Sequence, residues 1–172
     1  MVNLKPIPDL ERRAEEGSVY EGEERVITFR AATFQLFIDT VIAMAGSKVT
    51  RTIFYLIGEA IGRRSYEYSK DQLTTSDNLA DVLDSVLSLR GWGRLVSMKR
   101  AETPEEVTYE STFNHCIICH NRKAEEPICD VVRGIFAGWL ETFTGKKASS
   151  CIEIDCRAMG KGSCVFKTTL PK

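Results

Sequence analysis

Residues 151–166 read CIEIDCRAMGKGSCVF, and this stretch decides the fold of the C-terminal part of the chain. Short β-rich runs lie on both sides of it, over residues 148–156 and 163–170. Between them, Gly160 is typical of a tight turn. The pattern predicts two strands joined by a hairpin turn, with Cys156 and Cys164 brought close together across it.

A helix and a second hairpin are predicted upstream of this turn. Residues 127–144 have helical periodicity, with Pro127 in the first turn, where its missing N–H costs nothing. The strand-like runs 94–100 and 106–113 are separated by five residues, a plausible hairpin connection. Hairpin connections rather than crossovers favour an antiparallel sheet.

The N-terminal half predicts three amphipathic helices. The first carries one buried apolar stripe from Phe34 to Ala45. The second places Ile53, Leu56, Ile57, Ala60 and Ile61 on one side, while Gly58 and Gly62, four residues apart, would allow another backbone to approach closely. The third begins near Ser76 or Asp77, both suitable helix caps, and ends at residues 91–93. The two apolar faces at the start of the chain are expected to enclose a hydrophobic cavity or to form a dimer interface.

The predicted organisation is a polar N-terminal lead, residues 1–24, followed by a single ligand-binding domain, residues 25–172. A short strand is expected at 25–30. The predicted fold class is α+β, with an antiparallel sheet of about four strands covered on one face by about four helices.

Composition excludes several classes of protein. The chain has 172 residues, 23 basic against 24 acidic side chains and a net charge of -1, so a nucleic acid is not expected as the main partner. No apolar run reaches the roughly 20 residues of a membrane span, and the polar N-terminal residues are unlike a signal peptide. We therefore expect a cytoplasmic protein, in which the six cysteines are metal ligands or reactive thiols rather than disulfides.

The C-terminal hairpin is a candidate metal site. Glu153 lies three residues before Cys156, and in a regular strand the two side chains would face opposite sides, so they share a site only if the chain bulges near residues 155–157. Cys129, at the start of the predicted 127–144 helix, is the best candidate for a fourth ligand because a helix N-terminus favours a thiolate. Three thiolates and one carboxylate suit a closed structural zinc site. The alternative is that these cysteines are simply small buried apolar side chains.

A resemblance to a known family extends from these same residues. The pattern Cys129-x4-Gly134, then Ala137-Gly138, then Glu153-x2-Cys156-x-Ala158-Met159-Gly160-x3-Cys164-x-Phe166 resembles the signature of the 4-vinyl reductase domain family. Weaker similarity reaches back to about residue 25. The family includes sensor domains of phenol- and xylene-responsive transcription activators and a bacteriochlorophyll-biosynthesis protein, and it is similar in fold to TRAPP vesicle-tethering subunits and to nitric-oxide-signalling domains.

The resemblance implies a site and an assembly. In the phenol-sensing relatives the matching residues bind zinc beside an enclosed pocket for an aromatic ligand, so the implied zinc ligands here are Cys129, Glu153, Cys156 and Cys164. Family members typically form homodimers, which is implied for this chain too. The polar residues that hold phenol in those sensors have no clear counterpart here, so the identity of the ligand does not carry over.

A second cluster, His115, Cys116, Cys119 and His120, is a departure from the plainer family members. Cys-x-x-Cys-His is the attachment pattern of c-type haem, but that chemistry follows export. The cluster could instead be a thiol–disulfide switch, or it could hold a second metal or, non-covalently, a haem or another tetrapyrrole. The remaining alternative is a solvated loop with two incidental thiols.

We therefore expect a cytoplasmic small-molecule sensor rather than an enzyme. The chain has no nucleophile elbow, no Walker loop and no dinucleotide fingerprint, and a zinc ion with four protein ligands leaves no open catalytic position. A hydrophobic or aromatic ligand would shift a dimer interface or a contact with a separate downstream signalling partner. The alternatives are a haem-binding or redox sensor built on residues 115–120, a reductase acting on vinyl groups, and a tethering scaffold.

Overall fold

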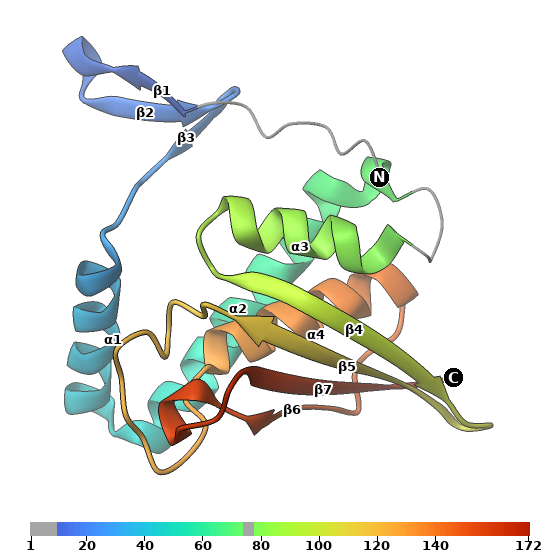
Figure 1. Cartoon of the computed structure of the whole chain (residues 1–172). Helices are drawn as coiled ribbons and strands as arrows, with labels where there is room; N and C mark the ends of the chain where they lie inside the picture. Colours follow the sequence, from blue (N-terminus) through green and yellow to red (C-terminus); the bar gives the residue numbers. More distant parts are fainter. Residues whose placement is uncertain (1–9, 74–77) are drawn as a thin grey trace.

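The computed structural model describes residues 10–73 and 78–172, and its centre is a four-stranded antiparallel sheet in the order β4-β5-β7-β6 (Figure 1). The strands are β4 Arg94–Glu102, β5 Glu106–Asn114, β6 Ser150–Asp155 and β7 Cys164–Pro171. Hairpins join β4 to β5 and β6 to β7, and β5 pairs with β7 along its whole length. The predicted hairpins and the predicted antiparallel sheet are confirmed.

Within the described residues, four α-helices accompany the sheet, which confirms the predicted fold class. They are α1 Ala31–Ala45, α2 Ser47–Ser69, α3 Leu79–Leu89 and α4 Asp130–Thr144, with a 3-10 turn, η2, at Lys70–Gln72. Helix α4 crosses the buried face of the sheet, where Phe136 packs against Phe113 of β5 and Phe166 of β7 at ring separations of 5.8 and 5.1 Å. These three side chains are fully buried, so the space between α4 and the sheet is a packed aromatic core.

Helices α2 and α4 lie in backbone contact because four glycines face each other. A methyl group on Gly58 would lie 2.0 Å from the carbonyl oxygen of Val131, and one on Gly134 would lie 2.1 Å from that of Tyr55. Gly62 and Gly138 meet backbone atoms of the opposite helix equally closely. This confirms the predicted close approach and identifies α4 as the neighbour of α2.

The apolar faces of α1 and α2 are more exposed than their periodicity indicated. In α1 only Ile38 is buried, and Phe37 is 54% exposed, so the prediction of a fully buried stripe was wrong. In α2 the side chains of Ile53, Leu56 and Ile57 are 39–54% exposed, while the buried side is the one that carries the glycines. The physical reason is that α2 uses its small residues to reach α4, which turns its branched apolar residues outward.

The segment before α1 forms a small separate sheet. Strands β1 Leu10–Arg13, β2 Ser18–Glu21 and β3 Glu24–Val26 pair in that order, with a 3-10 turn, η1, at Ala14–Glu16. Sequence analysis predicted only a polar lead and a strand at 25–30, because these strands are too exposed to alternate between apolar and polar residues. Figure 1 shows this sheet standing away from the four-stranded sheet and joined to α1 by an extended segment. The domain boundary at residue 25 stays a prediction.

Two predicted helix ends need comment. The predicted start of the third helix at Ser76 or Asp77 falls outside the described residues. Pro127 lies three residues before α4 rather than in its first turn, because Cys129 takes the N-cap position. Across residues 10–73 and 78–172, no helix combines the length and the hydropathy that a bilayer crossing requires.

Candidate metal centre

Three of the four predicted zinc ligands are fully buried cysteines at the ends of secondary-structure elements. Cys129 is the N-cap of α4, Cys164 is the first residue of β7, and Cys156 lies between β6 and the 3-10 turn η4 at Arg157–Met159. All three are 0% exposed. The sulfur of Cys129 lies 3.8 Å from that of Cys156 and 3.8 Å from that of Cys164. The hairpin turn thus brings its two cysteines to the N-terminus of α4.

The fourth predicted ligand reaches the site through the bulge that the sequence required. The pairing of β6 with β7 shifts register between Glu153 and Asp155, which turns Glu153 toward Cys129. One carboxylate oxygen of Glu153 accepts a hydrogen bond from the backbone N–H of Cys129 at 2.9 Å, and the other is buried with no hydrogen-bond partner among the described residues. Burial, and then the neighbouring Cys156 thiol, raise the pKa of Glu153 to about 8. A buried carboxylate oxygen without a partner is what a metal ligand presents before a cation is considered.

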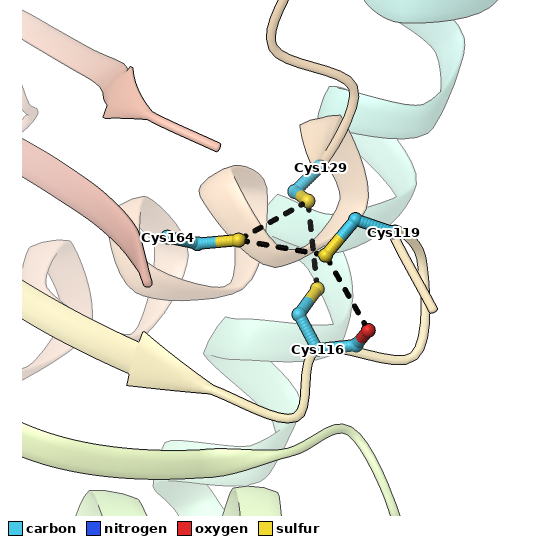
Figure 2. A group of neighbouring side chains, drawn as sticks. All are labelled: Cys116, Cys119, Cys129 and Cys164. Carbon is cyan, nitrogen blue, oxygen red and sulfur yellow. Dashed lines mark hydrogen bonds between the residues drawn. The ribbon is translucent and has the colours of Figure 1, made fainter. Parts of the chain in front are cut away.

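The loop after β5 brings Cys116 and Cys119 into the same site. Sequence analysis treated residues 114–126 as a polar loop, yet Cys116 and Cys119 are 1% and 5% exposed. The loop is fixed from outside, because the side-chain amide of Gln35 on α1 donates to the carbonyl oxygens of Ile117 and His120 at 3.2 and 2.8 Å. Figure 2 shows the sulfur atoms of Cys116, Cys119, Cys129 and Cys164 pointing toward one another from the loop, from α4 and from β7.

The donor atoms form two overlapping sets of four. One set is Cys116, Cys119, Cys129 and Cys164, and the other is Cys129, Glu153, Cys156 and Cys164; within each set all donor atoms lie within 4.8 Å of one another. Zinc–sulfur bonds of about 2.3 Å in a tetrahedron place sulfur atoms about 3.8 Å apart. The separations of 3.5 Å between Cys116 and Cys129 and 3.6 Å between Cys119 and Cys164 are close to that value. The donor set therefore fits a thiophilic metal ion.

Three residues near the site stay outside both sets. His115 and His120 are exposed, and the ring of His120 contacts the side chain of Asn121 instead of the sulfur atoms. Cys151 is buried, but its thiol contacts the hydroxyl group of Thr168 at 3.1 Å and the carbonyl oxygen of Arg133 at 3.3 Å. Of the predicted second cluster, the structure thus joins the two cysteines to the first cluster and leaves the two histidines outside it. The signal for this was present in the sequence, because Cys-x-x-Cys pairs commonly supply two ligands to one metal.

A cavity of about 320 Å³ lies beside the cysteines, between α1, α2, the loop and the start of α4. It is lined by Ile38, Ile42, Ser47, Thr50, Arg51, Phe54, Ile118, Arg122, Ala124, Glu125, Glu126, Pro127, Ile128, Asp130 and Val131. Arg51 forms ion pairs with Glu126 at 2.5 Å and with Asp130 at 3.3 Å. Burial raises the pKa of Asp130, although Arg133 and Arg51 oppose this effect. The cavity thus has an apolar interior and one neutralised ionic edge.

Comparison with known proteins confirms the resemblance and the fold. Residues 110–170 match the family model of the 4-vinyl reductase domain. The chain is similar in structure to the phenol-responsive sensory domain of the transcription activator PoxR, crystallised with phenol, with 19% identity, a TM-score of 0.77 and coverage of 94% of this chain and 84% of that chain. It is also similar to a vinyl-4-reductase family protein from Methanocaldococcus jannaschii, with 22% identity, a TM-score of 0.56 and coverage of 84% and 83%. At these identities the likeness establishes the fold. No curated protein sequence matches this chain.

Proposed function

We propose that this chain is a small-molecule sensing module that binds a hydrophobic or aromatic ligand in the cavity between α1, α2 and the loop after β5. The observation that carries the proposal is this cavity, set against a metal-type donor cluster in a chain with the fold of a phenol-responsive sensory domain. An apolar cavity of about 150 Å³ already accepts benzene, so one of about 320 Å³ has room for a ligand of one or two rings.

The metal in this proposal is a structural zinc ion held by Cys129, Glu153, Cys156 and Cys164. When bound, the ion supplies a four-point tether between the start of α4 and the β6–β7 hairpin. The tether matters for the ligand because Ile128 and Asp130, on either side of Cys129, line the cavity. Residues of the chain itself thus transmit the order of the metal site to the cavity wall.

The arrangement of the 115–120 loop supports a metal ion over haem. Attachment of haem would require the two thiols to reach a macrocycle, whereas the sulfur atoms of Cys116 and Cys119 face Cys129 and Cys164 inside the protein. The two histidines, which would be natural axial ligands, lie exposed outside the cluster.

The proposed module acts as a homodimer. Exposed apolar side chains follow the extended segment and one side of α1 and α2; they are Ile27, Phe29, Leu36, Phe37, Met44, Val49, Ile53, Leu56 and Ile57. Contiguous exposed apolar surface of this kind marks an interaction site, and a second copy offers the same face about a two-fold axis. Because α1 and α2 also line the cavity, a bound ligand would change the stability of the dimer or of a contact with a partner protein through its different affinity for the two states.

Ligand binding tests this function directly. Phenol and two-ring aromatic compounds are titrated into the zinc-loaded protein and binding is measured by calorimetry. Ile42→Trp, which fills the cavity, should weaken binding at least tenfold, whereas Thr40→Trp, an exposed position on the same helix, should leave it unchanged. Equal binding by both variants would mean that the cavity is not the ligand site.

A further inference from the structure

The two overlapping sets of donors contain more ligands than one metal ion can use. Together they hold five thiols and one carboxylate, whereas a structural zinc ion takes four ligands. If Glu153, Cys156, Cys129 and Cys164 hold one ion, Cys116 and Cys119 remain as two buried thiols directed at the sulfur atoms of Cys129 and Cys164. The Cys119 thiol also contacts the carbonyl oxygen of Cys116, at 3.6 Å.

The geometry of the overlap is specific. The sets share two residues only, Cys129 and Cys164, whose sulfur atoms lie 3.8 Å apart. Cys116 and Cys119 complete one tetrahedron on this shared edge, and Glu153 and Cys156 complete another. Two tetrahedra that share an edge are the arrangement of two metal ions bridged by two thiolates.

We propose that this protein binds two zinc ions in one binuclear site, in which the thiolates of Cys129 and Cys164 bridge the metals. Cys116 and Cys119 are the terminal ligands of the second ion. This inference rests on the zinc site of the proposed function and extends it to the loop after β5.

Charge and position both favour this arrangement. Five thiolates and one carboxylate carry six negative charges, which two divalent ions reduce to a net charge of -2, whereas a single ion would require thiols to remain protonated in a buried site. The bridging positions are also supported by the backbone. Cys129 caps the positive end of α4, and Cys164 accepts a hydrogen bond from the backbone N–H of Arg157 at 3.5 Å.

The second ion would complete the wall of the ligand cavity. Ile118, 1% exposed, lies between the two terminal ligands and lines the cavity, as does Arg122 a few residues later. The first ion holds α4 to the β6–β7 hairpin, and the second holds the loop to both. Metal content would therefore determine whether the cavity is formed.

Metal stoichiometry measured on the full chain tests this proposal. The reduced, metal-free protein is titrated with zinc alone, and the bound metal is counted by native mass spectrometry and elemental analysis. We expect two zinc ions per chain in the natural protein and one in a Cys116→Ser/Cys119→Ser variant. Cys151→Ser removes a buried thiol outside both sets, and this control should keep two.

Cobalt, a spectroscopic substitute for zinc, tests the shared thiolates in the unaltered protein, so the result does not depend on how a variant folds. The first equivalent should give an electron paramagnetic resonance signal, and the second should diminish it because bridging sulfur atoms couple the two spins. Saturation at one ion per chain, two uncoupled ions, or a coloured cluster with acid-labile sulfide would each overturn the binuclear site. Saturation at one ion leaves the proposed zinc site standing, whereas no bound metal at all would also remove that site.

Discussion

Replacement of Gly134 by alanine tests the packing that places α4, and with it Cys129, in the molecule. The added methyl group would lie 2.1 Å from the carbonyl oxygen of Tyr55 and 2.7 Å from the backbone nitrogen of Glu59. Both neighbours are backbone atoms of α2, so neither can rotate away. The two helices must separate by roughly 1 Å to reach an ordinary contact distance, a change that disturbs packing along their whole interface.

The magnitude follows from two opposed effects. Overpacking of this kind costs about 3 kcal/mol, the upper end of the usual range, because the obstruction is backbone. Alanine recovers about 1 kcal/mol of helix propensity relative to glycine. The net loss of about 2 kcal/mol should lower the melting temperature of a domain of this size by about 4–8 °C.

Thermal unfolding followed by circular dichroism measures this effect. Gly162→Ala is the matched control, because no atom lies within 4 Å of the added methyl group and its φ lies outside the left-handed region. The control should melt at the same temperature as the natural protein or slightly above it. A Gly134→Ala protein that melts at or above the natural temperature would refute the backbone contact between α2 and α4.

Two further predictions concern the ionic network behind α4 and the exposed apolar face. Burial raises the pKa of Glu59, but hydrogen bonding with Lys147 and the charge of Arg63 outweigh this and hold that pKa below its ordinary value. Such a group stabilises the fold above the pKa of the unfolded chain and loses this contribution as pH falls through the folded pKa, so Glu59→Gln should cost about 1.5–3 kcal/mol in urea unfolding at pH 7 and much less at pH 3. An equal cost at both pH values would contradict this assignment. On α1, Leu36→Asp with Met44→Asp should raise the dimer dissociation constant at least tenfold in analytical ultracentrifugation, while Ile152→Asp, an exposed position on β6, should not; a dimer unaffected by the α1 changes would have a different interface.

The local patterns of the chain determined much of the fold. Alternation over residues 94–113 and 148–170 was sufficient for the two hairpins, because each pairs strands that are neighbours in sequence. The motif around Cys156 and Cys164 was sufficient for the four-ligand set, because the spacing across the turn brings these two sulfur atoms into the same site. The requirement for a bulge at Glu153 also followed from the sequence, because side chains on a strand alternate between its faces.

Only the tertiary structure decided which apolar faces are covered and where the second pair of cysteines lies. Periodicity shows that α1 and α2 are amphipathic, but burial depends on the neighbour, and the glycines of α2 bring α4 to the opposite side. Cys116 and Cys119 lie in a loop without periodicity, and Cys119 reaches Cys164 across 45 residues of sequence. Distances of that kind arise when β5 pairs with β7, which places the end of one strand beside the start of the other, and no local pattern encodes that pairing.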